Sequence, residues 1–107
     1  MKKKYDKEVV EVLLPLISEA SGVEQSVILS TSRLRMVTVC RFILFRYLFE
    51  ELGWSTPRIG RAFHKEHATV IHGIDRAKDF ITLPSYETER AIHDDFIERV
   101  MIHENEQ

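Results

Sequence analysis

Apolar residues recur at helical spacing along most of this chain, and no segment shows the strict alternation of a half-buried strand. Residues 5–20 carry the first helical pattern, with Pro15 inside it. Because proline lacks a backbone N–H and clashes with the preceding turn, we expect a kink or a break there. Gly22 predicts the end of this helix, and residues 23–29 predict one or two further helical turns.

The most apolar stretch is residues 36–52, where apolar side chains fall on nearly every face of a helix. A helix of this kind is buried on all sides, so we expect it at the centre of the fold. Gly53 predicts its end. Ser55 or Thr56 predicts the cap of the next helix, and Pro57 fits its first turn, where a missing N–H costs nothing.

Two amphipathic helices joined by a short turn follow. Ile59 and Phe63 predict the buried face of the first helix. The second helix has apolar residues at steps of four, three and four, which predict one buried stripe: Val70, Ile74, Ala77 and Ile81. This pair predicts a helix-turn-helix whose second helix starts near residue 66.

Two more segments complete the predicted secondary structure. Residues 30–35 predict a polar loop with two arginines before the central helix. Residues 86–103 predict a last amphipathic helix with an acidic outer face and an inner face of Ile92, Phe96 and Val100. The chain therefore predicts an all-α fold, a compact bundle of five to six helices with an embedded helix-turn-helix.

At 107 residues, with 44% hydrophobic and 30% charged side chains, the chain has the size and composition of one globular domain. No apolar run approaches the ~20 residues that cross a bilayer. The Met-Lys-Lys-Lys start is not followed by an apolar core, so we expect neither a membrane span nor a secretory leader. The single cysteine, Cys40, fits buried packing and a reduced, cytoplasmic setting.

The formal net charge is −2, but the charges are unevenly distributed. Residues 33–79 carry nine Lys or Arg against five Asp or Glu, whereas residues 82–107 carry two against seven. A basic patch in the middle of the chain can therefore act on a nucleic acid although the whole chain is weakly acidic.

The predicted turn and the start of the second helix carry the candidate chemistry. In a helix-turn-helix protein this part of the second helix enters the major groove of DNA. Lysine supplies charge, histidine and threonine hydrogen-bond base edges, alanine touches a thymine methyl, and glutamate accepts from a cytosine amino group or caps the helix. The candidate base readers are Lys65, Glu66, His67, Ala68 and Thr69. Helix pairs of this kind also occur without any role in DNA binding.

Other chemistry finds less support in the sequence. Three neighbouring histidines do not share one helical face, so we expect no metal site from them: His64, His67 and His72. We expect the acidic side chains of the last helix, Asp94 and Glu98 among them, to form a solvated face rather than a catalytic pair. Since no nucleophile, base and orienting group can be assembled, we expect neither an enzyme nor a cofactor.

Residues 63–73 read Phe-His-Lys-Glu-His-Ala-Thr-Val-Ile-His-Gly. They resemble the signature Phe-Gly-Gly-Arg-Asp-His-Thr-Thr-Val-Leu-His-Ala of the C-terminal DNA-binding domain (domain IV) of the bacterial replication initiator DnaA. Residues 57–63, 41–43 and 23–35 resemble further segments of that domain in the same order. The resemblance covers about residues 9–100, so the family predicts that residues 1–107 are a single domain of this type, with a Trp-repressor-like helix-turn-helix.

The resemblance implies binding of duplex DNA, in replication initiation or its regulation, with sequence preference. It assigns base reading to residues 65–69 and contacts with the DNA backbone or minor groove to a second set: Arg33, Arg35, Thr56, Pro57, Arg61, His72 and Arg76. The signature here is one residue short before His67, and it has Lys65, Glu66 and Ala68 where the family has arginine, aspartate and threonine. Lysine cannot make the bidentate fork of arginine, so the standard DNA box of the family is not assumed to be the target.

The sequence has no Gly-x-x-x-x-Gly-Lys run that would cradle a phosphate, so we expect a stand-alone reader domain without the initiator's ATPase. The alternative is a protein-interaction module that keeps the fold but does not bind DNA tightly. In that case its acidic C-terminal helix would dock on a protein partner.

Overall fold

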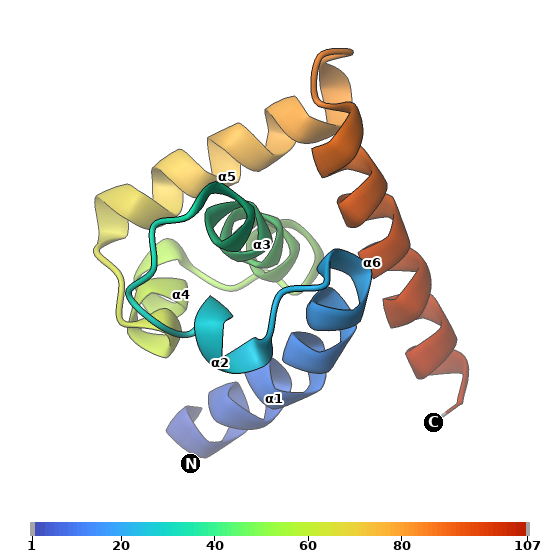
Figure 1. Ribbon diagram of the computed structural model, residues 1–107. Helices are drawn as coiled ribbons and strands as arrows, with labels where there is room; N and C mark the ends of the chain where they lie inside the picture. The colour runs from blue at the N-terminus through green and yellow to red at the C-terminus, as the bar shows by residue number, and fades with distance from the viewer. Residues whose placement is uncertain (1, 107) are drawn as a thin grey trace.

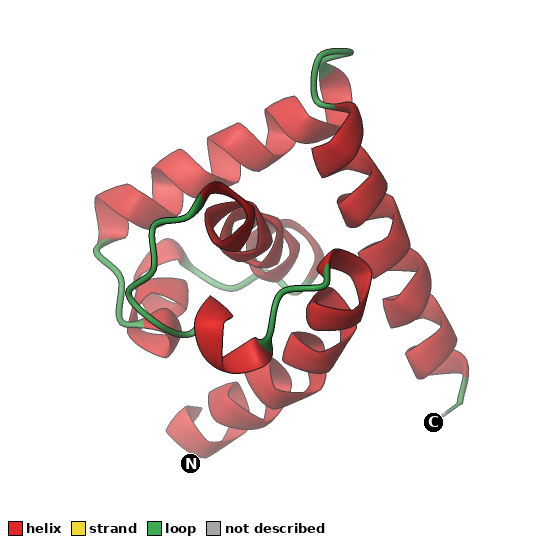
Figure 2. Ribbon diagram, in the orientation of Figure 1, coloured by secondary structure: helices red, strands yellow, loops and turns green. Residues whose placement is uncertain are grey.

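The computed structural model describes residues 2–106, and those residues are helical apart from short connections (Figures 1 and 2). The elements follow in the order α1 (Lys2–Ser21), α2 (Gln25–Ile28), α3 (Arg35–Arg46), the π-helical turn η1 (Tyr47–Glu51), α4 (Thr56–Phe63), α5 (His67–Thr82) and α6 (Glu87–Asn105). The predicted all-α bundle is confirmed. None of the described helices is long and apolar enough to cross a bilayer.

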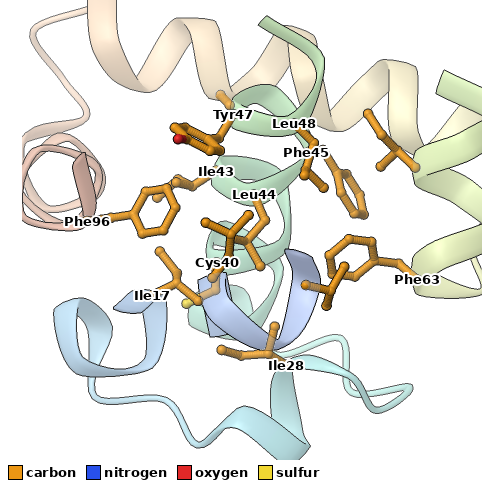
Figure 3. Close-up of a cluster of buried hydrophobic side chains, with 14 of the residues drawn as sticks. Ile17, Ile28, Cys40, Ile43, Leu44, Phe45, Tyr47, Leu48, Phe63 and Phe96 are labelled. Carbon is orange, nitrogen blue, oxygen red and sulfur yellow. The ribbon is translucent and has the colours of Figure 1, made fainter. Parts of the chain in front are cut away.

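Helix α3 lies at the centre, and the other helices surround it (Figure 1). Its side chains point in all directions into the core, toward Ile17 and Phe96 on one side and Phe63 on the other (Figure 3). The most extensive contact between two helices is that of α3 with α5, and Gly73 lies in it. A Cβ atom at Gly73 would lie 2.6 Å from a ring carbon of Phe42. The glycine therefore sets how closely α5 approaches the central helix.

Of the kink or break expected at Pro15, the break is wrong, because α1 continues through Pro15 to Ser21. Proline removes one backbone hydrogen bond from the helix. The residues around it, Leu14 and Ile17, are 4% and 0% exposed, so α1 is fixed to the core on both sides of the proline. Burial of such side chains contributes about 1.5–3 kcal/mol each, enough to offset one missing hydrogen bond.

The central helix ends in a π-helical turn that the sequence pattern did not predict. The N–H of Leu52 donates to the carbonyl of Tyr47 at 3.3 Å, a bond that spans five residues. Gly53 follows with a φ of 71°, the left-handed conformation that glycine adopts without strain, and ends the helix as predicted. The start of the central helix is one residue earlier than predicted, so Arg35 lies inside α3 rather than in the loop.

The stripe predicted for α5 is confirmed at Val70, Ile74 and Ala77, but the prediction for Ile81 is wrong. Phe80 is buried there instead, and Ile81 is only partly covered. Phe80 contacts Tyr86 just before α6, with their ring centroids 5.2 Å apart, so the position facing α6 belongs to the larger aromatic residue. The predicted inner face of α6 is confirmed, since all three of its residues are buried: Ile92, Phe96 and Val100.

Candidate nucleic-acid interface

Helices α4 and α5 form the predicted helix-turn-helix at the edge of the bundle (Figure 1). The Ser55 hydroxyl accepts the N–H of Arg58 at 3.3 Å and caps α4, with Pro57 in the first turn. Ile59 and Phe63 anchor the helix in the core. The local signals in the sequence therefore act as predicted, since the cap starts α4 and two apolar residues orient it.

The turn between the two helices is tight. His64 has φ 55° and ψ 46°, a left-handed backbone conformation that is strained for residues other than glycine. The N–H of Lys65 donates to the carbonyl of Gly60 at 2.9 Å. A Cβ atom at Gly60 would lie 2.6 Å from the Lys65 carbonyl oxygen, so this close approach needs glycine. Gly60 and His64 together bring the start of α5 back against α4.

The four residues at the start of α5 are all exposed: Glu66, His67, Ala68 and Thr69. Glu66 occupies the N-cap position, but its side chain makes no capping hydrogen bond. The suggestion that Glu66 caps the helix is therefore wrong. The carboxylate is left at the surface, where a donor such as a cytosine amino group could reach it.

His67 is held by a contact from α4. Its Nδ1 atom lies 2.9 Å from the Thr56 hydroxyl oxygen, and both residues are the first of their helices. The bond fixes the ring and leaves Nε2 as its other polar atom. Thr56, assigned above to the DNA backbone, thus also orients a candidate base reader.

The polar loop before α3 is shaped by Arg41, which is only 5% exposed. Its guanidinium donates to the carbonyls of Ile28 at 2.7 Å and Ser32 at 2.6 Å, and also to Ser30. The sequence had given Arg41 only as part of the resemblance. Its position in the structure makes it a structural residue that holds the loop carrying Arg33.

Lys65 in the turn is affected by the positive charges of Arg33 in the loop and Arg41 in α3. Burial lowers the pKa of Lys65, and repulsion from Arg41 and Arg33 lowers it further. Such a cluster of like charges is relieved by an anion, and phosphate is the anion that DNA presents.

A second group of candidate residues surrounds a cavity of about 310 Å³ between α3 and α5. Its basic side chains are Arg33, Arg35, His72 and Arg76, and its other walls include aromatic side chains, among them Phe42, Phe80 and Tyr86. We call this cavity the arginine pocket. The structure thus brings together four of the seven residues assigned to the DNA backbone or minor groove.

The remaining three residues of that set lie around α4. Thr56 is at its start, and Pro57 and Arg61 line a wider groove of about 870 Å³ between α1 and the turn. Lys65 and His67 line the same groove. The predicted residues therefore form two groups. One group lies around the starts of α4 and α5, and the other lies around the arginine pocket further along α5. DNA contact by each of them stays a prediction.

Two contacts from the last helix region were not predicted. The Arg35 guanidinium is paired with the carboxylate of Glu89, and Nη1 of Arg76 donates to the Tyr86 hydroxyl at 3.3 Å. The hydrogen bond to Tyr86 raises the pKa of Arg76 above its ordinary value. Glu89 is buried, and no sequence pattern marks it, because it falls among the many acidic residues near the C-terminus.

Two other residues lie away from this surface. Trp54 is a packing anchor, since it is 3% exposed and the Arg58 guanidinium lies 4.0 Å from its ring centroid. Cys40 is fully buried in α3, and burial raises the pKa of its thiol, which fits inert packing. Among residues 2–106, no three His, Cys, Asp or Glu side chains are placed to hold a metal ion.

Comparison with known proteins identifies one related family. The family model described as bacterial dnaA protein helix-turn-helix matches residues 10–77, which run from the middle of α1 nearly to the end of α5. No curated protein and no solved structure matches the chain. The match includes α4, the turn, most of α5 and every candidate residue named above for DNA, but it ends before α6.

Proposed function

Because this chain belongs to the bacterial DnaA helix-turn-helix family, we propose that it binds duplex DNA with sequence preference, in replication initiation or its regulation. The start of α5 enters the major groove, and residues 66–69 read base edges there. A helix-turn-helix is a binding module rather than a catalytic one. A DNA partner also places the chain in the cytoplasm, where it can reach the nucleoid.

The observation that carries this proposal is the exposed and braced start of α5. Side chains that read bases must project from a rigid element, because a loosely held group loses affinity when it is ordered on binding. Here the turn is fixed by the bond from Lys65 to Gly60, and the His67 ring is fixed by Thr56. His67, Ala68 and Thr69 all project from this braced end.

The neighbouring charges support the same docking. The start of α4, with the backbone N–H of Thr56, lies beside the start of α5, and a helix start of this kind favours a phosphate. On the other side, Lys65 and Arg33 offer positive charge to the adjoining backbone or minor groove. Asp75 and Asp79 lie two or more turns further along α5, where they can stay outside the groove.

The test is selection of bound duplexes from a random pool, followed by titration of the recovered duplex by fluorescence anisotropy at several salt concentrations. We expect an enriched sequence, and a log affinity that falls linearly with log salt with a slope of ~0.9 per phosphate contacted. If no duplex binds better than micromolar at low salt, DNA reading is wrong and the protein-interaction module becomes the better interpretation.

A further inference from the structure

Helix α6 lies outside residues 10–77, yet the region around its start touches the arginine pocket. Tyr86, just before α6, lines the pocket and accepts a hydrogen bond from Arg76. Glu89, in the first turn of α6, is paired with Arg35. Two of the three arginines of the pocket are therefore held by residues that the family match does not cover.

The pair of Arg35 and Glu89 is unequal in exposure. The Glu89 side chain is 9% exposed, whereas the Arg35 side chain is 65% exposed. The contact uses Nη2 of the guanidinium, so other N–H groups of Arg35 face the solvent at the mouth of the pocket. Arg35 can thus meet an incoming anion without leaving Glu89, but the carboxylate already compensates part of its positive charge.

Glu89 is ionised at neutral pH. Burial of the carboxyl opposes ionisation, but its own backbone N–H and Arg35 outweigh burial, so the pKa of Glu89 lies below its ordinary value. A buried carboxylate is screened less by water and salt than an exposed one. It therefore acts on any anion that enters the arginine pocket.

The pocket is placed to meet the DNA backbone. Arg76 is seven residues after Thr69, which corresponds to about 10 Å along α5. The major groove is about 12 Å wide. When the start of α5 is in the groove, the outer side chains two turns along it come close to the strand that borders the groove.

We propose that the arginine pocket binds a backbone phosphate of the duplex, and that Glu89 is a built-in counter-ion that limits how strongly Arg35 contributes. This inference rests on the proposed function. Glu89 repels the phosphate and competes with it for Arg35. The acidic start of α6 thus sets the affinity of the domain for DNA, independently of the base readers on α5.

The test compares Glu89→Gln with Glu98→Gln in salt titrations of the selected duplex and of an unrelated duplex. Glutamine keeps the shape of Glu89 and an acceptor oxygen for Arg35, and it removes only the charge. We expect Glu89→Gln to bind both duplexes several-fold more tightly than wild type at low salt, with a salt slope steeper by up to ~0.9. Glu98→Gln makes the same charge change on the exposed face of α6, and we expect no change of slope from it.

A double-mutant cycle assigns the gain to Arg35. Arg35→Ala should weaken binding little in the wild-type background and several-fold in the Glu89→Gln background. If circular dichroism shows that Glu89→Gln is unfolded, the inference can still be tested with Arg35→Ala alone. Arg35→Ala should reduce the affinity for DNA less than Arg33→Ala does.

Three results would overturn the inference while leaving the proposed function intact. These are tighter binding by both glutamine variants alike, unchanged or weaker binding by folded Glu89→Gln, and an Arg35→Ala loss as large as that of Arg33→Ala. A different result, no duplex binding by wild type or by any of the variants, would overturn the proposed function itself. The wild-type titration therefore separates the two failures.

Discussion

The hydroxyl oxygen of Thr56 and Nδ1 of His67 lie 2.9 Å apart, which joins the first residue of α4 to the first residue of α5. If the hydroxyl donates, Nε2 carries the ring proton and offers a donor to the bases. If Nδ1 donates, Nε2 offers an acceptor. In both cases α4 sets the orientation and the hydrogen-bonding character of the candidate base reader His67, so the starts of the two helices are coupled.

Thr56→Val keeps the branched shape and removes the hydroxyl. We expect affinity for the selected duplex to fall by about 1 kcal/mol, roughly fivefold, because the His67 ring is no longer fixed. Affinity for an unrelated duplex should fall less. Anisotropy titrations with both duplexes measure the difference, and Thr88→Val on the exposed face of α6 is the matched control. An equal loss on both duplexes would mean that Thr56 acts only on the DNA backbone.

His67→Ala and Arg33→Ala should affect DNA binding in different ways. Loss of a base contact costs about 1–3 kcal/mol of discrimination, so His67→Ala should relax the selected sequence. Arg33 is exposed in the loop, and its loss should weaken binding to all sequences alike and reduce the salt slope by ~0.9. Repeating the selection and the salt titration for each variant tests this. Nonspecific losses of the same size from both variants would contradict the placement of α5 in the major groove.

His64 is the one residue other than glycine, among residues 2–106, with a positive φ. A left-handed backbone conformation costs an L-residue roughly 1–2 kcal/mol. Replacement by glycine relieves this strain, but the greater conformational entropy of glycine in the unfolded state cancels part of the gain. We expect His64→Gly to raise the free energy of unfolding by about 0.5–1 kcal/mol. Urea unfolding monitored by circular dichroism measures it. The His64 side chain is exposed, so no packing is lost.

Gly53→Ala is the reverse control for His64→Gly. Gly53 has a φ of 71°, and a Cβ atom there would meet nothing within 4 Å, so only the backbone conformation is changed. We expect a loss of about 1 kcal/mol. If His64→Gly destabilises the protein while Gly53→Ala behaves as expected, the His64 side chain makes a favourable contribution that outweighs the backbone strain.

Local signals in the sequence were enough to predict the helix-turn-helix. The Ser55 cap, Pro57 and the apolar residues Ile59 and Phe63 act within one or two turns of the chain, and the structure follows them. The exposure of the start of α5 also follows from the buried stripe on its other face. These features depend on local periodicity, which a sequence shows directly.

Features that depend on distant residues could not be predicted in the same way. Arg35 and Glu89 are 54 positions apart, and only the packing of α6 beside α5 brings them together. The continuation of α1 through Pro15 depends on how firmly its flanks are buried. The choice of Phe80 over Ile81 depends on Tyr86 across the interface. In each case tertiary packing overrides the local preference.

Arg41→Lys should destabilise the fold and loosen the loop that carries Arg33. The guanidinium reaches several main-chain carbonyls at once, among them Ile28 and Ser32, and an ammonium cannot span them. We expect a loss of about 1.5–3 kcal/mol in urea unfolding and faster amide exchange in residues 30–34. Arg99→Lys is the control, because Arg99 makes only partly exposed ion pairs, and it should cost less than about 1 kcal/mol. Similar losses from both variants would contradict the role of Arg41.

Glu89→Gln should make stability less sensitive to acid. The pKa of Glu89 is below its ordinary value near 4.5 in the folded state, so folding favours the ionised carboxylate. Its contribution is complete above the ordinary pKa and is lost as pH falls through the lower folded pKa. Wild type should therefore lose more stability than Glu89→Gln between about pH 6 and pH 3.

Urea unfolding at several pH values in that range measures the difference between wild type and Glu89→Gln. Arg35→Ala provides an independent check, because Arg35 favours the ionised form of Glu89 both by its hydrogen bond and by its charge. In Arg35→Ala, as in Glu89→Gln, the free energy of unfolding should fall less steeply than in wild type as the pH decreases. The double variant should have the same pH dependence as Glu89→Gln alone, since the titrating carboxyl is already gone. If the free energy of unfolding falls as steeply with decreasing pH in both single variants as in wild type, the Arg35–Glu89 pair does not contribute to folding in solution.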